Sequence, residues 1–346
     1  DKPLAPPLAS GEVAIDPERG RFAFPAGEAP AGEVSVSFRY AFTGEVGAGP
    51  YARPDLAQAT LTVARTRNAD HATLQAAIDA APDGAAAPVI IEILDSATYS
   101  EALAIDHRSF PGGLTLQAAD QETPCVVKPG AGANLLTVQN SQIAELRLDG
   151  LTLAGGNVAV SGDVGRLVLK NCSLSPQTAG VTLAGSNASV QLAQSICGPV
   201  AIAAPEGSLE VTDSIVQHPS ASVEAPGGHP ALAFAGGVGR LERSTLIGDL
   251  ALHSGYLSSL LLYGELALAD PGAGCLRFSR LPGPFAKTGF RCTDAVPVFA
   301  SLRFGDPGYC HLHPNTAAEL GRGAEEGGEV GAFYRAGLPW RTQNVG

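Results

Sequence analysis

The chain has 346 residues, of which 45% are hydrophobic and only 16% are charged, against about 25% charged residues in an average soluble domain. Its 34 acidic and 22 basic side chains leave a net charge of −12, which argues against nucleic acid as a partner because a phosphate backbone needs a basic surface. No apolar run reaches the roughly 18 residues of a membrane-spanning helix, and 42 glycines with 26 prolines disfavour long helices.

Residues 1–70 are predicted to form a β-rich segment of their own. Apolar and polar residues alternate over 11–16 and 34–40, as they do in strands, and Pro- and Gly-rich stretches separate the two. The opening DKPLAPPLAS has neither the basic nor the apolar region of a signal peptide. We therefore expect the protein to act in the cytoplasm or in a particle that is assembled there.

A short amphipathic helix is predicted within 73–84, where Asp83-Gly84 ends it. Apolar strands are then predicted at 89–93 and 113–117. In this place the helix would cover the open end of a stacked β structure, whose apolar interior must not be exposed. The residues expected on its buried face are Leu74, Ala77, Ile78 and Ala81.

The middle of the chain repeats a unit of roughly 20 residues, a length typical of solenoids. Each copy has an alternating strand, a polar corner and a second short strand, and Gly-x-Val-Gly-Arg-Leu occurs at both 162–167 and 236–241. The glycines of this motif are predicted to supply turns with positive φ. The residues before the polar corners are Leu148, Leu169, Leu192, Val211, Leu241 and Leu257, at steps of 21, 23, 19, 30 and 16 residues.

This repeat predicts an all-β fold, a right-handed parallel β-helix. The fixed Leu-x-x-Leu-x-Leu frame of a leucine-rich repeat and the Asn-Gly hairpins of a β-sandwich are both missing. The general rule for parallel crossovers gives the right hand. We expect the β-helix over residues 71–290, the short helix as its N-terminal cap, and irregular flanks, namely residues 1–70 and a C-terminal tail at 291–346.

Residues 73–127 resemble the N-terminal part of right-handed parallel β-helix proteins of the pectinesterase and pectate-lyase type. In that family such a helix precedes a strand end with the pattern Gly-Thr-Tyr-x-Glu. Its counterpart here is Ala97-Thr98-Tyr99-Ser100-Glu101. The resemblance implies the fold and its handedness.

Further stretches are similar to a group of large bacterial β-helix proteins associated with phage-tail-like or contractile-injection gene neighbourhoods. The similarity covers most of the chain and implies a structural or surface-binding role. The stretches that carry it are 15–24, 274–279, 301–309 and 323–333.

The outward side chains at the polar corners are the candidates for catalysis. The pectinesterase motif Gln-Asp-Thr-Leu is absent. Two carboxylates that act as acid and base need opposed pKa values and must lie close together. In the row of outward side chains that the aligned corners form, which we call the corner row, Ala and Thr separate the acidic residues. An ordinary solvated corner is therefore favoured over a catalytic groove. The catalytic candidates are Asp149, Asp213 and Glu242.

A cluster near the C-terminus offers possible metal ligands. Cys310, His311 and His313 lie within four residues, and Cys292 is a possible fourth ligand. A structural zinc site normally uses separated pairs of ligands, so an ordinary loop is favoured and no cofactor is expected. The six cysteines contain no Cys-x-x-Cys pair, which favours reduced thiols, although a Cys275–Cys292 bridge stays open.

The sequence therefore predicts a non-enzymatic structural or binding component of a larger bacterial or phage-tail-like assembly. The β-helix would act as a rigid spacer, and its flanks would dock to other protein subunits or to a second copy. The alternatives are a polysaccharide-active β-helix enzyme (a lyase, esterase or hydrolase) and a glycan-binding module. Neither nucleic acid nor membrane is expected as a partner.

Overall fold

The computed structural model describes residues 8–16, 21–31, 45–130, 132–185, 187–204 and 206–335. The chain forms two compact units, residues 1–42 with 305–307 and residues 43–304 with 308–346. In the first unit β1 (Ala14–Asp16) pairs antiparallel with β2 (Arg21–Ala23). The strand predicted at 34–40 lies outside the described residues. No helix in the described part of the chain is long and apolar enough to cross a membrane.

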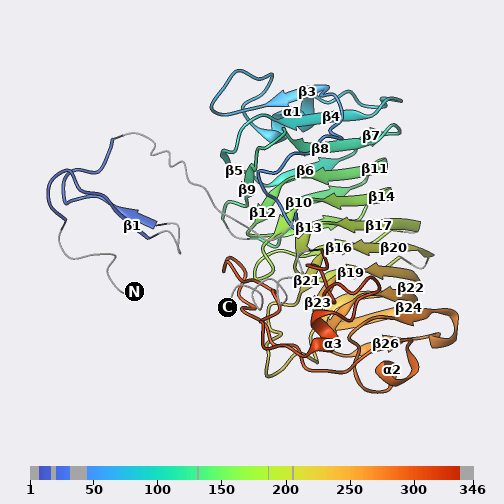
Figure 1. Ribbon diagram of the computed structural model, residues 1–346. Helices are drawn as coiled ribbons and strands as arrows, with labels where there is room; N and C mark the ends of the chain where they lie inside the picture. Colours follow the sequence, from blue (N-terminus) through green and yellow to red (C-terminus); the bar gives the residue numbers. More distant parts are fainter. Residues whose placement is uncertain are drawn as a thin grey trace. The chain divides into compact units, whose positions relative to one another are not determined.

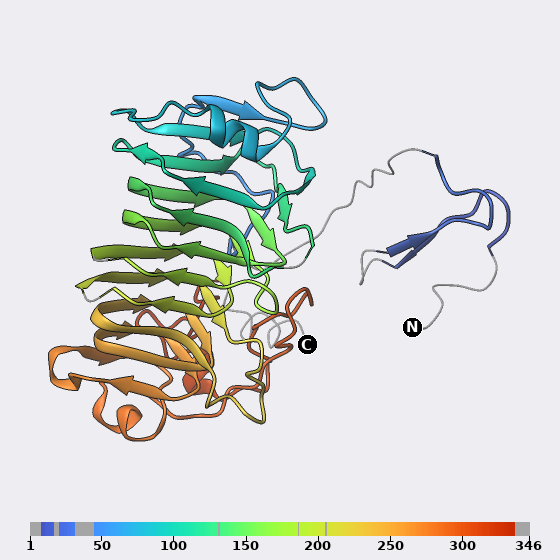
Figure 2. The same ribbon diagram turned by 180° about the vertical axis from the view of Figure 1, so that it is seen from behind.

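The second unit is a right-handed parallel β-helix, as the repeat predicts (Figures 1 and 2). Each regular coil places one strand on each of three faces. The first and second faces belong to one 17-stranded sheet, and the third face is an 8-stranded sheet. Because side chains alternate along a strand, every second residue points into the solenoid and forms its apolar core.

The strands are assigned to the faces as follows. The first face holds β6 (Leu103–Asp106), β10 (Asn134–Gln139), β13 (Asn157–Val160), β16 (Val181–Leu183), β19 (Val200–Ile202), the first parts of β22 (Pro230–Glu242) and β24 (Asp249–Ser258), and β26 (Leu266–Leu268). The second face holds β3 (Leu61–Val63), β4 (Val89–Ile93), β7 (Ser109–Phe110), β8 (Leu114–Ala118), β11 (Gln142–Asp149), β14 (Asp163–Lys170), β17 (Asn187–Ala193), β20 (Glu206–Thr212), the later parts of β22 and β24, and β27 (Cys275–Arg277). The third face holds β5 (Thr98–Ser100), β9 (Cys125–Val127), β12 (Thr152–Ala154), β15 (Ser173–Leu174), β18 (Ile196–Cys197), β21 (Ile215–Gln217), β23 (Thr245–Ile247) and β25 (Leu261–Tyr263).

The register predicted from the residues before the corners is confirmed at every step. The β-helix itself was expected to start at residue 71, but the strand pairing of its second face already begins at β3. The observed pairs are Leu148 with Leu169, Leu169 with Leu192, Leu192 with Val211, Val211 with Leu241, and Leu241 with Leu257.

The two copies of Gly-x-Val-Gly-Arg-Leu are not structurally equivalent. Leu167, which ends the first copy, aligns through Val190 and Leu209 with Gly239 rather than with Leu241. The copies are therefore displaced by two residues along the strand. A shift of two keeps each side chain on the same side of the sheet, so the core tolerates it.

The prediction that the motif's glycines supply turns with positive φ is wrong. Gly162 and Gly165 do not have positive φ. A Cβ at either position would lie 2.9 Å from a carbonyl oxygen of the preceding coil, that of Ser141 or Ala144. These glycines therefore allow close stacking of adjacent coils.

The residue after each strand end on the second face adopts the left-handed conformation instead. Non-glycine residues in this region are strained by roughly 1–2 kcal/mol unless local hydrogen bonds compensate. One left-handed residue per coil turns the chain from the second face to the third. These corner residues are Gly150 (φ 76°), Asn171 (50°), Gln194 (49°), Asp213 (47°), Arg243 (46°) and Ser259 (53°).

A buried hydroxyl ladder stabilises these corners. Ser195, Ser214 and Ser244 each follow a corner residue and are completely buried. The Oγ of each accepts a hydrogen bond from the backbone N–H one coil earlier, at 3.1, 3.0 and 3.2 Å. Each hydroxyl also donates to the carbonyl two residues before it, at 2.7–2.9 Å. Cys172 continues the ladder, and its Sγ donates to the carbonyl of Lys170 at 3.3 Å.

Short helices lie at opposite ends of the solenoid (Figure 1). The predicted capping helix is α1 (Leu74–Ala80), and all four residues expected on its inner face are buried. The carboxylate of Glu101 accepts hydrogen bonds from the backbone N–H groups of Leu74 and Gln75 at 3.1 and 2.9 Å, which stabilises the helix N-terminus. At the other end, Phe285 and Ala286 of α2 (Gly283–Thr288) lie against the core.

Two irregular segments of the second unit cover parts of the solenoid. Residues 45–58, which we call the strap, run along the corners, where the N–H of Gly47 donates to the carbonyl of Gln194 at 2.7 Å. The C-terminal segment, residues 291–304 and 308–335, includes α3 (Ala318–Gly321) and packs on the third face. Its buried Tyr309 hydroxyl donates to Gln217 of β21 at 2.6 Å. The core shared by this segment and the third face includes Ile215, Ile247, Leu261, Leu312, Leu320 and Phe333.

Candidate functional site

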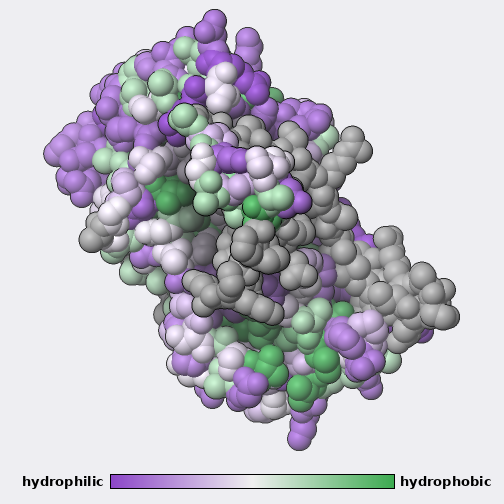
Figure 3. All heavy atoms as spheres, turned by 90° about the vertical axis from the view of Figure 1, so that its left-hand side faces the viewer, coloured by the Kyte–Doolittle hydropathy of each residue, from purple (hydrophilic) through white to green (hydrophobic). Residues whose placement is uncertain are grey.

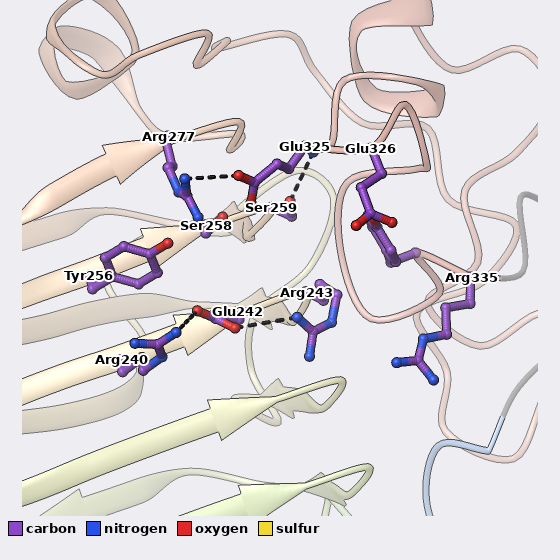
Figure 4. A pocket seen from close by; sticks show the side chains of 11 residues that line it. Arg240, Glu242, Arg243, Tyr256, Ser258, Ser259, Arg277, Glu325, Glu326 and Arg335 are labelled. Atoms are coloured by element: carbon purple, nitrogen blue, oxygen red, sulfur yellow. Dashed lines mark hydrogen bonds and ion pairs between the residues drawn. The ribbon is translucent and has the colours of Figure 1, made fainter.

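A polar pocket of about 350 Å³ lies between the second face and the end of the C-terminal segment (Figure 4). Outward side chains of β22, β24 and β27 line one side, and residues 325–335 line the other. We call it the corner pocket. Its charged residues are Arg240, Glu242, Arg243, Arg277, Glu325, Glu326 and Arg335.

Tyr256 lies between two guanidinium groups on neighbouring strands. The Arg240 and Arg277 guanidinium carbons lie 4.7 and 5.1 Å from the centre of its ring. The strand register explains this contact, because Tyr256 pairs with Arg240 and Arg277 is two residues beyond its partner on β27. Both arginines contact the ring through cation–π interactions.

Asp213 and Glu242, two of the catalytic candidates, are linked by Arg243. The Arg243 guanidinium binds the Asp213 carboxylate in a bidentate manner, at 2.8 and 3.0 Å, and lies 3.3 Å from Glu242. Glu242 also pairs with Arg240. Each carboxylate is therefore held by arginine through charge-assisted hydrogen bonds or ion pairs.

Asp149, the third candidate, lies far from this pair, with Lys170, Ala193 and Thr212 between it and Glu242 in the register. It is buried under the strap, and its Oδ1 lies 3.9 Å from Nη1 of Arg53. Burial raises the pKa of Asp149, although Lys170, Arg147 and Arg53 oppose this. The three candidates do not form one site.

The outward row of the first face carries small side chains. Every member of its central row is alanine or threonine, while the next outward position on β6 and β10 carries Asp106 and Gln139, which are hydrogen-bonded to each other at 3.1 Å. The row, in strand order, is Ala104, Thr137, Ala159, Thr182, Ala201, Ala233, Ala251 and Ala267.

The possible metal ligands near the C-terminus have separate surroundings. Cys310 is buried, and the His311 ring stands edge-on against Phe333 at 4.3 Å between ring centres. Burial lowers the pKa of His311. Nδ1 of His313 accepts a hydrogen bond from the N–H of Asn315. Within the described residues, no group of three or more His, Cys, Asp or Glu could hold a metal ion, and all six cysteines are free thiols.

Most residues of the corner pocket were not candidates from the sequence. The alignment of corners did place Asp213 directly before Arg243 in the stack, and their opposite charges were a usable signal. Arg240 lies one outward position before Glu242 on β22, and Tyr256 lies one outward position before Ser258 on β24. Glu325 joins the site from a distant, non-repetitive segment, and no periodic pattern indicates such a contact.

Two stacked histidines connect the longest insertion between coils to the solenoid. The rings of His218 and His229 lie 5.2 Å apart and 14° from parallel. Nδ1 of His218 accepts a hydrogen bond from the N–H of Ser220. Burial and the neighbouring His229 lower the pKa of His218 from 6.5, while Asp249 opposes the shift. Protonation of both rings would place like charges against each other.

We expect acid to release this insertion. Since the pKa of His218 is lower in the folded loop, the loop's stability is complete above pH 6.5 and is lost as pH falls through the folded-state pKa. Hydrogen exchange of residues 219–229, corrected for intrinsic rates, should rise severalfold between pH 7.5 and 5.5. His229→Gln removes the repulsion and should reduce this rise. An equal rise in the variant would contradict the prediction.

Comparisons with known proteins add a likeness at the level of the fold. A scan against protein-family models and a search of curated proteins both find no match. Among solved structures, the pectin methylesterase PemA from Erwinia chrysanthemi is similar with a TM-score of 0.34 and 13% identity, over 59% of this chain and 72% of that chain. The β-helix is established by the strand pairings of this chain itself.

Proposed function

We propose that the protein is a non-enzymatic structural or binding component of a larger assembly, of the bacterial or phage-tail-like kind, formed in the cytoplasm. The β-helix serves as a rigid spacer. The flanking segments and the corner pocket dock to other subunits or to a second copy.

The neutralisation of the outward carboxylates carries this proposal. Asp213 and Glu242 are held by arginines, and Asp149 is buried beside Arg53. The first face offers only alanine and threonine in its central outward row. General acid–base catalysis needs a group positioned to reach a substrate proton, whereas each of these three carboxylates already contacts an arginine.

The surface also favours docking through polar contacts. Among the coloured residues in Figure 3, hydrophilic side chains predominate and the apolar ones form separate patches. Non-obligate protein interfaces are about as polar as the remaining surface, so such a face is compatible with reversible assembly.

The proposal is tested by the native mass of the protein from its own source, after gentle lysis, by size-exclusion chromatography with light scattering. We expect a defined complex or homo-oligomer. A monomer over the whole elution profile would contradict the assembly role.

Binding of an acidic glycan is the second candidate, favoured by the four arginines of the corner pocket. A screen with neutral and acidic polysaccharides would distinguish turnover from binding. We expect no turnover. Turnover that Asp213→Asn or Glu242→Gln abolishes, while Asp306→Asn leaves it unchanged, would establish an enzyme instead.

A further inference from the structure

We propose that the corner pocket is the docking site for an acidic peptide segment of a partner protein, and that the chain's own Glu325 holds the Arg277 position of this site in the free state. This inference depends on the proposed assembly role and names the chemistry of the partner. Glu325 belongs to an acidic stretch of the chain, Ala-Glu-Glu-Gly-Gly-Glu at residues 324–329.

Glu325 shows how the pocket holds an acidic residue. Its carboxylate binds Nη1 of Arg277 at 2.8 Å, and its backbone N–H donates to the hydroxyl of Ser259 at 3.3 Å. Figure 4 shows both contacts, which reach the residue from two adjacent coils. The pocket thus engages a side-chain carboxylate and a main-chain N–H together, two groups that an acidic peptide presents.

The aromatic group of the pocket favours a peptide over a sugar. A sugar ring that stacks on Tyr256 would need an open ring face. Arg240 and Arg277 lie over that ring at 4.7 and 5.1 Å, from neighbouring strands on its two sides. Beside the carboxylates of Glu242 and Glu326, the pocket therefore presents guanidinium N–H groups, which bind carboxylates with two parallel hydrogen bonds.

Basic side chains remain accessible beside the occupied position. The side chain of Arg240 is 55% exposed, and Arg335 is exposed and points toward the pocket from the far side (Figure 4). A longer acidic segment could replace Glu325 on Arg277 and also reach these two residues. The internal segment competes at high effective concentration because it is covalently attached, so its removal should strengthen binding of a free peptide.

The test measures binding of a fluorescein-labelled hexaglutamate peptide by anisotropy at low salt. We expect Glu325→Gln to bind about fivefold more tightly than the wild type, the factor that corresponds to a partly exposed ion pair. Arg240→Gln in the Glu325→Gln background should reverse this gain. Arg303→Gln, which changes an exposed arginine outside the pocket, is the matched control. Circular dichroism confirms that each variant is folded.

Three results would overturn the site: equal affinity of Glu325→Gln and the wild type, equal loss with Arg303→Gln, or unchanged binding by the Arg240→Gln variant. Tighter binding of trigalacturonate than of the peptide, with the same dependence on Arg240, would also overturn it and assign the pocket to an acidic glycan. A native complex without peptide binding would leave the assembly role standing and remove only this site.

Discussion

Replacing Arg53 with methionine is expected to lower the free energy of unfolding by about 3 kcal/mol, because removal of one partner of a buried ion pair is strongly destabilising and leaves Asp149 with only its contact to Arg147 at 3.8 Å. Arg53 and Asp149 have side chains only 4% and 6% exposed. Nη2 of Arg53 also donates to the carbonyls of Ala119 and Glu122, which attaches the strap to the solenoid. Urea denaturation followed by circular dichroism measures the loss.

Two further variants identify the cause. Arg67→Met removes an arginine that is 53% exposed and paired with Glu122, so its cost should stay below about 0.5 kcal/mol. Asp149→Asn in the Arg53→Met background neutralises the remaining buried charge and should recover part of the loss. If Arg53→Met is no more destabilising than Arg67→Met, the strap is not attached through this pair.

Ser214→Ala should cost about 2 kcal/mol by interrupting the hydroxyl ladder. The Ser214 hydroxyl accepts from the N–H of Ser195 at 3.0 Å and donates to the carbonyl of Thr212 at 2.7 Å. Alanine would leave the buried N–H of Ser195 without a partner, which costs about 1–3 kcal/mol, while the Thr212 carbonyl would keep its hydrogen bond from the N–H of Gln194 at 3.0 Å. Chemical denaturation measures the change.

Cysteine and an exposed serine provide the controls for this prediction. Ser214→Cys should be clearly less destabilising than Ser214→Ala, because Cys172 already continues the ladder through its thiol. Ser208→Ala removes an exposed hydroxyl that bonds to Ser189 on the same face, and its effect should stay within about 0.5 kcal/mol. Equal losses for the three variants would show that the ladder has no special role.

The repetitive part of the fold could be predicted from the sequence because its signals are local. Alternation identifies the strands, and the residues before the corners determine the register from Leu148 to Leu257. The near-identical motif at 162–167 and 236–241 suggests an alignment of the two strands that is wrong by two residues. Because side chains alternate with period two, a shift of two residues leaves the same side chains facing inward. Inward-facing patterns alone could not decide between the two alignments.

The segments outside the repeat could not be predicted in the same way. The contact of Arg53 with the corner of Gly150 and that of Glu325 with Arg277 join residues far apart in the sequence. Each contact occurs once, so no periodicity indicates it. The corner row was expected to keep its acidic residues apart, whereas Arg243 links Asp213 and Glu242 on neighbouring coils.

The uniform corner makes the solenoid a molecular ruler that can be lengthened or shortened by whole units. Excision of residues 193–211 would join Leu192 to Thr212, which already aligns with Ala193 in the stack. The separation of the two capping helices would then shrink by one strand spacing, about 4.8 Å. Gene duplication or deletion of single coils could therefore tune the span between the ends of the β-helix while the contacts at each end stay unchanged.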